Sequence, residues 1–437
     1  ALKTGIATLN RPYDNDYLNT HFNLNMLVPT SGNEDVYKGY MKKMILGKIG
    51  GKIVYRNLDM EIVSPDYELI EHMTDVCTNF GFKYNIIDPS NSSSIGLNPF
   101  VYDNPTKIAI TISSALKAMY TTVHEETEDV YREDFIIQAI ENLAIILKEM
   151  YPKMNDGALP NMEDMLKMFT NFDLIEKMCE IMAHDETLRN KYSVQLSYFK
   201  KCFYKDGVGK EQTERDIYAA VTQLDNLLRL PGVKSILCNR FNNIDFDKAL
   251  ENGELTFICT RRGDLGSSTH QAFGLFFLIS MQNAVLRRPG SESTRIPNFL
   301  YIDEFPDFMC KSTEAIFTMY RKYRVGSVIS AQNLAQLSTT KAKENLKTTL
   351  LSNCASKIFT GNGVVDELNW WSAEFGKIRE WTFKNDINFN TGKYEDKHGD
   401  VKWEYINVFS AGKLQGMLTD KKCAYKIRDL GGKYLIG

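Results

Sequence analysis

Short apolar runs and amphipathic stretches divide the chain into three parts. In the first and last parts, apolar runs alternate with segments that carry apolar residues at i, i+3 and i+4, and this alternation predicts an α/β domain with a mainly parallel central sheet. In the middle part, helical spacing continues without a convincing strand, which predicts an all-helical insertion. We therefore expect a first half-domain at 1–114, the insertion at 115–230, and a second half-domain with a C-terminal extension at 231–437.

The segment from 298 to 337 carries the strongest pattern for chemistry. Its first apolar run, Phe299 to Ile302, leads directly into Asp303 and Glu304, and such a run is typical of a strand buried on both faces of a parallel sheet. Because ligands bind outside the carboxyl ends of these strands, the acidic pair fits a Walker B motif. Asp303 would hold Mg²⁺, and Glu304 would activate the attacking water. The alternative is a polar loop start or the cap of the next helix.

A second apolar run begins at Ser327 and ends in Gln332, whose amide could sense a γ-phosphate. Between the two strands we expect a helix that exposes Arg321, Lys322 and Arg324. An exposed arginine cluster at this place would suit an arginine finger that reaches into a neighbouring subunit. The second strand and the basic helix together favour the Walker B interpretation over a polar loop.

The expected strand at 23–28 should lead into a glycine-rich turn that ends in Gly-Lys-Ser/Thr if the domain cradles phosphates. The turn and a following helix are predicted, but Glu34 and Asp35 place negative charge where phosphates need positive charge. Lys38 lies nearby in the expected helix and is the alternative source of that charge. A loop at 47–51 would follow this helix. The candidate phosphate-binding positions of this degenerate Walker A segment are Thr30, Ser31, Gly32, Asn33, Glu34, Asp35, Val36 and Tyr37.

Two arginines, Arg261 and Arg262, follow another predicted strand at 255–259. At the carboxyl end of a strand they could face a nucleotide phosphate or the site of a neighbouring subunit. Surface ion pairs are an equally good interpretation. The sequence alone leaves both interpretations open.

The composition of the 437-residue chain is that of an ordinary globular protein, with 43% hydrophobic and 24% charged residues and a net charge of −3. It is not a polycation, so any contact with DNA would be local. Eight cysteines without a CxxC pair indicate reduced thiols and no metal or disulfide framework. No stretch approaches about 18 continuous apolar residues, so we expect no membrane span in this chain. Because the sequence begins at Ala1, it could be a fragment with an anchor upstream.

The order of these features resembles the motor domain of the HerA/FtsK group of RecA-like ring ATPases, in particular its type IV secretion and conjugation branch. The resemblance is closest to VirB-four-like conjugal-transfer ATPases of Gram-positive mobile elements, with TraG/TraD-like coupling proteins as a sister group. It covers about 25–435 and is most specific over 236–381. The stretches that carry it are DPSNSSSIGLNPF, NRFNNIDFDKALENGELTFICTRRGDLG, FLYIDEFPDF, YRKYRVGSVISAQNLAQL, LSNCASKIFTGN and ELNWWSAEFGKIREW.

The resemblance implies a RecA-like P-loop NTPase fold, a homo-hexamer or similar ring, and ATP with Mg²⁺ at the subunit interfaces. It also implies a cytoplasmic position at the inner face of the membrane, docking to the components of a secretion channel, and contact with single- or double-stranded DNA. Asp303 and Glu304 match the family's Walker B motif, Gln332 its glutamine motif, and Arg321 its arginine finger. The segment at 30–37 departs from the family pattern.

Two functions are therefore expected from the sequence, with a TraG/TraD-like DNA-translocating coupling protein as a further alternative. The first is an ATPase that powers transfer of DNA or protein through a membrane channel. The second is a non-catalytic subunit that keeps the assembly surfaces of the same machinery but does not hydrolyse ATP. The two differ in nucleotide binding, which 30–37 argues against and the rest of the predicted site argues for.

Overall fold

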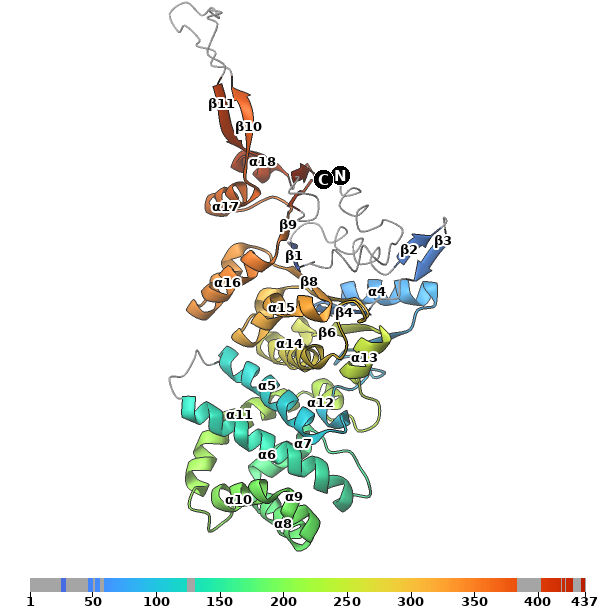
Figure 1. Ribbon diagram of the computed structural model, residues 1–437, viewed down its shortest axis with the longest axis vertical. Coiled ribbons are helices and arrows are strands. Elements are labelled where there is room, and N and C mark those ends of the chain that lie inside the picture. The colour runs from blue at the N-terminus through green and yellow to red at the C-terminus, as the bar shows by residue number, and fades with distance from the viewer. Residues whose placement is uncertain are drawn as a thin grey trace, which may run out of the picture.

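The computed structural model describes residues 25–28, 46–49, 52–55, 59–123, 130–382, 402–417, 419–420, 422–426 and 434–436. Figure 1 shows a sheet in the middle of an elongated molecule, with a helical region at one end and a two-stranded ribbon at the other. The Walker A segment at 30–37 lies outside the described residues, and so does most of the helix predicted after it. Among the described residues, no helix is long and apolar enough to cross a membrane.

The central sheet has nine strands, and every neighbouring pair from β9 to β5 is parallel. β12 pairs antiparallel with β9, and β13 pairs antiparallel with β12. The predicted α/β architecture with a mainly parallel sheet is confirmed. In spatial order the strands are β13 (Tyr434–Ile436), β12 (Ala424–Lys426), β9 (Ser356–Phe359), β1 (Asn25–Val28), β8 (Val325–Ser330), β7 (Asn298–Ile302), β4 (Asp59–Ser64), β6 (Leu255–Cys259) and β5 (Tyr84–Ile87).

The continuous apolar run of β7 is explained by cover on both faces of the sheet. Phe299 and Tyr301 pack into a cluster with the apolar residues of α4 (Tyr67–Phe80). Leu300 and Ile302 belong to the other cluster, which includes the apolar residues of α14 (Arg262–Arg287). Because successive side chains of a strand point to opposite faces, every residue of β7 is buried.

The sequence pattern does not predict β4, because Asp59 and Glu61 interrupt its apolar residues. In the structure β4 is a central strand between β7 and β6. Glu61 is buried, and its Oε2 accepts a hydrogen bond of 2.8 Å from Nδ2 of Asn298 on β7. A hydrogen-bonded partner on the neighbouring strand reduces the cost of burying this polar residue.

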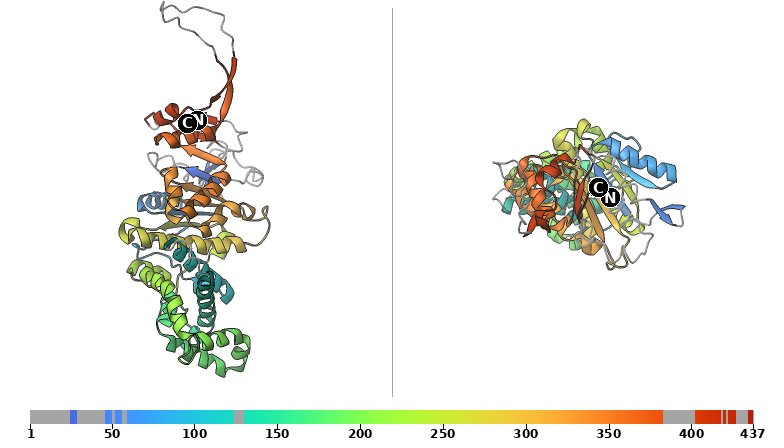
Figure 2. Two further views of the ribbon diagram at one scale, coloured as in Figure 1. Left: turned by 90° about the vertical axis from the view of Figure 1, so that its left-hand side faces the viewer. Right: turned by 90° about the horizontal axis from the view of Figure 1, so that it is seen from above.

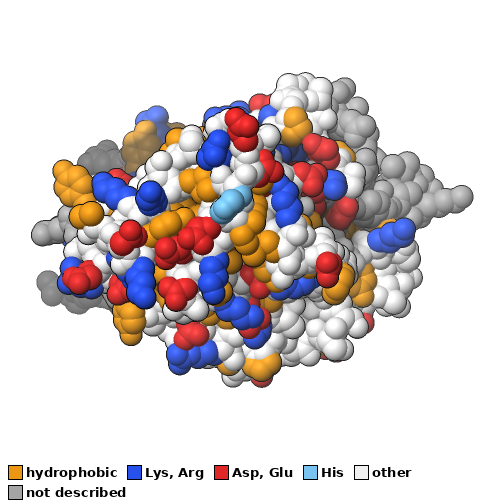
Figure 3. All heavy atoms as spheres, turned by 90° about the horizontal axis from the view of Figure 1, so that it is seen from below, with side chains coloured by type: hydrophobic (Ala, Val, Ile, Leu, Met, Phe, Trp, Pro, Cys, Tyr) orange, Lys and Arg blue, Asp and Glu red, His pale blue; other side chains and the backbone are white. Residues whose placement is uncertain are grey.

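Between β5 and β6, the described residues form helices and no strand. α5 packs against α6 and also against α14, so it joins the helical region to the sheet; residue 114, the predicted boundary, lies inside α5. The far end of this region carries positive and negative side chains interspersed with apolar ones (Figure 3). The helices are η1 (Pro99–Val101), α5 (Pro105–Val123), α6 (Val130–Met154), α7 (Met162–Thr170), α8 (Phe172–His184), α9 (Glu186–Lys191), α10 (Ser193–Cys202), α11 (Lys210–Leu228), α12 (Pro231–Leu237) and α13 (Phe246–Asn252).

Two small antiparallel sheets lie outside the central sheet. β2 (Leu46–Ile49) pairs with β3 (Lys52–Tyr55), and β3 does not join the parallel sheet. The prediction of a loop at 47–51 is therefore wrong for residues 47–49, which belong to β2. β10 (Lys377–Thr382) pairs with β11 (Lys402–Asn407) and forms the ribbon at the end of the molecule (Figure 2). The remaining helices are η2 (Phe305–Phe308), η3 (Lys311–Glu314), α15 (Ala315–Thr318), η4 (Tyr320–Tyr323), η5 (Leu334–Ser338), α16 (Lys341–Asn353), α17 (Val365–Phe375) and α18 (Ala411–Gly416).

Candidate nucleotide site

Asp303 follows the last residue of β7 and is held by the ends of both neighbouring strands. Its Oδ1 accepts a hydrogen bond of 2.7 Å from Oγ of Ser330, the last residue of β8. Its Oδ2 accepts one of 3.2 Å from Oγ of Ser64, the last residue of β4. The carboxylate is therefore fixed at the carboxyl edge of the sheet, where parallel α/β sheets bind their ligands.

Glu304 and Gln332, the other two residues predicted at this edge, lie beside Asp303. Glu304 has left-handed backbone angles (φ 52°, ψ 43°), and its N–H donates to Oγ of Ser330 over 2.9 Å. Nε2 of Gln332 donates a hydrogen bond of 2.8 Å to Oε1 of Glu304. The structure thus brings together the acidic pair and the glutamine, and a single hydroxyl, that of Ser330, contacts both acidic residues.

The two serines were not identified as candidates, although each one ends an apolar run. Ser330 closes the run of β8, and Ser64 closes that of β4 and is followed by a proline. The available signal was a small hydroxyl residue at the carboxyl end of a predicted strand. For Ser64 this signal was hidden because β4 itself was not predicted.

Arg321 lies at the amino-terminal ends of the strands, whereas Asp303 lies at their carboxyl ends. It belongs to η4, which precedes the first residue of β8, whereas Ser330 at the end of β8 contacts Asp303. The six residues of β8 separate the two edges by roughly 17 Å at about 3.3 Å per residue. Within one chain Arg321 cannot contact the acidic pair, and an arginine-finger role would require a second copy.

The predicted exposed helix with three basic residues is wrong in two respects. The segment between β7 and β8 consists of short pieces, η2, η3, α15 and η4, in place of one helix. Arg321 and Lys322 are exposed, but Arg324 is buried, and its Nη1 donates to the carbonyl oxygens of Ser293 and Arg295. Arg324 therefore stabilises the loop before β7 and is not available to a neighbouring subunit.

Arg261 follows β6 and forms a two-pronged ion pair within the chain. Its Nε and Nη2 donate to Oδ1 and Oδ2 of Asp88 over 2.8 and 2.7 Å, and the Asp88 side chain has no exposed surface. The guanidinium also lies 4.2 Å from the ring centre of Tyr67. The sequence left open whether Arg261 faces a phosphate or forms an ion pair, and in the structure it forms an ion pair. A phosphate contact would require this pair to open.

Arg262 joins a polar cluster next to the acidic pair. Its Nη1 lies 3.1 Å from Oδ2 of Asp307, and Nε2 of the buried His270 lies 3.4 Å from the same oxygen. Nδ1 of His270 lies 3.3 Å from Oγ1 of Thr260. Burial raises the pKa of Asp307, but the close approach of His270 and the charge of Arg262 lower it by more. The cluster holds η2, the turn that follows Glu304, against the start of α14.

The pKa of the Asp303 carboxyl is shifted upwards, in contrast to that of Asp307. Its pKa is raised from the ordinary 3.8 to about 6, mainly by burial and also by the charge of Glu304, although the hydrogen bonds from Ser330 and Ser64 oppose the shift. Among the described residues, none of the groups that shift this pKa is a cation. Its side-chain partners among the described residues are the hydroxyls of Ser330 and Ser64, and hard oxygen ligands suit Mg²⁺. The residues present therefore fit a hydrated Mg²⁺ ion.

Because its pKa is raised on folding, Asp303 adds stability below pH 3.8 and loses that contribution as the pH rises through about 6. We expect Asp303→Asn to increase the free energy of unfolding at about pH 8 by up to roughly 2 kcal/mol, with no gain at about pH 4. Urea unfolding at both pH values, without nucleotide or Mg²⁺, measures this difference.

Asp307→Asn is the control for this prediction because its pKa is shifted downwards. That variant should lose stability at about pH 8 and lose less at low pH. Equal destabilisation of Asp303→Asn at both pH values would show that the buried carboxylate carries no cost.

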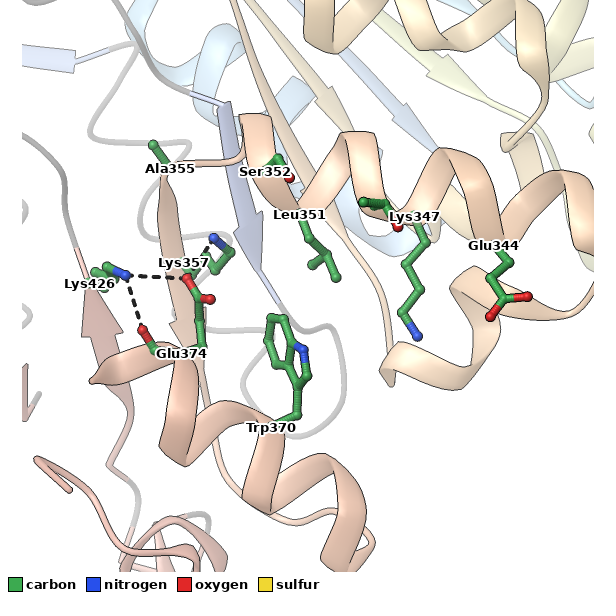
Figure 4. Close-up of a pocket in the computed structure, with 10 residues that line it drawn as sticks. Glu344, Lys347, Leu351, Ser352, Ala355, Lys357, Trp370, Glu374 and Lys426 are labelled. Carbon is green, nitrogen blue, oxygen red and sulfur yellow. Dashed lines mark hydrogen bonds and ion pairs between the residues drawn. The ribbon is translucent and has the colours of Figure 1, made fainter. Parts of the chain in front are cut away.

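A cavity of about 710 Å³ lies elsewhere, between α16, β9, α17 and β12 (Figure 4). In it, Oε1 of Glu374 accepts hydrogen bonds from Nζ of Lys357 over 2.9 Å and from Nζ of Lys426 over 3.3 Å. Glu374 is therefore paired with both lysines within the chain. Because the cavity contains none of the residues around Asp303, we place the candidate nucleotide site at the strand ends.

The parallel sheet, the acidic pair after β7 and the glutamine after β8 define a RecA-like P-loop NTPase fold. Two forms of a conjugative coupling protein share it. TrwBdeltaN70 in an unbound form matches with a TM-score of 0.59 and 14% identity over 92% of this chain and 80% of that chain. TrwB in complex with ADP and Mg²⁺ matches with a TM-score of 0.58 and 16% identity, over 92% and 81%.

Residues 297–406 also match the family model described as the TraM recognition site of TraD and TraG. A structure of VirB4 of Thermoanaerobacter pseudethanolicus matches with a TM-score of 0.43 and 13% identity, over 79% of both chains. No curated protein matches the sequence. The resemblance to conjugation ATPases that the sequence predicts is confirmed by the family model and by the shared fold.

Proposed function

We propose that this chain is a motor-domain subunit of a type IV secretion or conjugation system, which powers or supports the transfer of DNA or protein through a membrane channel. The observation that carries the proposal is the network of Asp303, Ser330, Glu304 and Gln332 at the carboxyl edge of the sheet. A Walker B site needs an acidic residue for Mg²⁺ and a group that positions the attacking water, and these residues supply both.

Within this site the chain's own residues have distinct roles. Asp303 is the carboxylate that would hold hydrated Mg²⁺, and the serines at the ends of β4 and β8 orient it. Glu304 is the base that would orient and activate a water, and Gln332 fixes its carboxylate through the hydrogen bond of 2.8 Å. Bound Mg²⁺ would supply charge stabilisation for the phosphates. The structural neighbour TrwB was solved with ADP and Mg²⁺, which supports a nucleotide and Mg²⁺ as the molecules bound at this site.

The matches favour the coupling-protein branch over the VirB-four-like branch as the nearer model for function. The family model over 297–406 is that of TraD and TraG, and the coupling-protein structures cover 92% of this chain. On this proposal the chain acts at the inner face of the cell membrane with the secretion channel as its partner, and DNA is the transported substrate.

A ring of identical subunits, with six as the number that the family resemblance implies, accounts for the position of Arg321. In one chain Arg321 and Asp303 lie at opposite ends of β8. Arg321 belongs to η4, which precedes β8, and Asp303 contacts Ser330, the last residue of β8. In a ring, the edge of one subunit that carries Arg321 can face the acidic edge of the next. The exposed guanidinium is then the group that would reach the neighbour's nucleotide.

A non-catalytic assembly subunit of the same machinery is the second candidate, and a specific observation favours it. The segment at 30–37 has no lysine and carries Glu34 and Asp35. Loss of the lysine removes a charge-assisted contact to the phosphates. In that case the acidic pair at 303–304 would be an inherited feature without a reaction to perform.

Calorimetric titration of the purified chain with ATP and Mg²⁺ distinguishes the two candidates. We expect micromolar binding if Lys38 or another neighbour supplies the missing charge, and then the ATPase is the better account. Absence of binding at millimolar nucleotide would contradict the ATPase and support the assembly subunit.

A variant with Glu34→Gly, Asp35→Lys and Val36→Thr serves as the matched comparison. It should bind nucleotide at least about tenfold more tightly than the natural chain if only the loop is degenerate, because one charge-assisted contact is worth more than about 1.4 kcal/mol. No gain would mean that the rest of the pocket has also lost its function.

A further inference from the structure

The ribbon of β10 and β11 leaves the body of the protein on a well-defined base. Nδ2 of Asn407 donates a hydrogen bond of 2.9 Å to Oγ of Ser372 on α17, and the N–H of Val408 donates to the carbonyl of Gly376 over 3.0 Å. The rings of Phe375 and Phe409 pack edge to face just below, with centres 5.2 Å apart. Figures 1 and 2 show the two strands extending away from the sheet and from the helical region.

One face of the ribbon is aromatic. Trp381 lies opposite Trp403 and Arg379 opposite Tyr405, so all four side chains are on the same face. The two indole rings contact each other with centres 3.6 Å apart, and the Arg379 guanidinium lies 4.8 Å from the centre of the Trp403 ring. The exposed fractions are 47% for Trp381, 43% for Trp403 and 70% for Tyr405. Exposed apolar rings that gather on one surface are typical of a binding site.

The two faces of the ribbon differ in charge, because only the reverse face carries acidic residues among the paired positions. Lys377 and Arg379 are on the aromatic face, which has no acidic residue among the paired positions. On the reverse face Glu380 and Glu404 lie directly opposite each other, and Lys402 pairs with Thr382 at the last position of that face. The far end of the helical region, by contrast, mixes both signs (Figure 3). The aromatic face of the ribbon therefore combines stacking surfaces with positive charge, in a protein whose net charge is −3.

We propose that this face binds single-stranded nucleic acid. Bases stack on aromatic rings without regard to sequence, and lysine and arginine neutralise the phosphates that run beside them. The ring of Tyr405 and the outer surfaces of the two indoles are the stacking groups, and Lys377 and Arg379 are the phosphate contacts. This inference rests on the proposed function, because it assigns the surface that holds a transported DNA strand.

The test is fluorescence anisotropy of a labelled oligo(dT) strand of about 20 nucleotides with the full chain, between about 50 and 200 mM salt. Tyr405→Ala should weaken binding about tenfold, since one stacked base is lost. Arg379→Gln should weaken binding several-fold and lower the slope of log K against log salt by about 0.7.

Reverse-face variants provide matched controls. Ile378→Ala removes a side chain that is 45% exposed on the reverse face, and Glu380→Gln removes one charge next to Arg379. Neither should weaken binding. The same variants are titrated with ATP and Mg²⁺, and Tyr405→Ala should bind nucleotide as the unchanged chain does.

Three results would overturn the proposal. Unchanged affinity of Tyr405→Ala and Arg379→Gln would place the DNA contact elsewhere. If the chain binds nucleotide but not oligo(dT), DNA binding by the ribbon is contradicted, whereas the proposed motor function is not. Sedimentation with phosphatidylserine vesicles that is lost in the two aromatic-face variants, without any effect on oligo(dT), would make the ribbon a membrane contact.

Discussion

Glu304→Gln is expected to reduce ATP hydrolysis by about 100-fold or more and to leave nucleotide binding within about twofold. Glutamine keeps the length of the side chain and can still accept a hydrogen bond from Gln332, but it cannot take a proton from water. A positioned base contributes roughly 10²- to 10⁴-fold to a rate. Steady-state phosphate release and calorimetry on the same preparation measure the two effects.

Glu251→Gln is the control for this variant, because Glu251 is an exposed glutamate of α13, far along the chain from the acidic pair. Its rate should equal that of the natural chain. A hydrolysis rate that survives Glu304→Gln would remove Glu304 as the base. A natural chain that binds ATP without hydrolysing it would favour the assembly subunit.

Arg261→Ala is expected to lower the free energy of unfolding by about 3 kcal/mol, because it leaves the Asp88 carboxylate buried without its cation. Nucleotide binding should not change, since both donor nitrogens already contact Asp88. Urea unfolding and calorimetry test the two parts of this prediction.

The neighbouring Arg262→Ala offers a comparison at the next position. Arg262 is 46% exposed and pairs with Asp307, so its loss should cost no more than about 1 kcal/mol. If Arg261→Ala proves as mild and instead weakens nucleotide binding tenfold, then Arg261 contacts the phosphate and the ion pair opens in the bound state.

The sequence was sufficient for the parts of the site that are local in the chain. β7 and β8 are apolar runs, and Asp303, Glu304 and Gln332 follow from the polar residues at their ends. Ser64 could not be predicted in this way because Glu61 interrupts the apolar pattern of its strand. The hydrogen bond with Asn298 explains how the buried glutamate is accommodated there. Pattern analysis cannot supply a partner on a distant strand.

The same limit applies to the arginines. Whether Arg261 faces a ligand or an ion pair depends on Asp88, which lies 173 positions away in the sequence. An arginine is usually exposed, but Arg324 is buried because carbonyl oxygens of the loop before β7 accept hydrogen bonds from its guanidinium. Side chains with long reach are placed by tertiary contacts, so their roles follow from the structure alone.

The hydrogen bond between Ser64 and Asp303 joins residues 239 positions apart, and most of the chain between them belongs to the helical region. Helices form from local contacts and are fast to fold, whereas pairing of β4 with β7 must close a very long loop. We infer that the acidic site is among the last features to appear during folding. A nascent chain can therefore complete its helices before the residues of the acidic site come together.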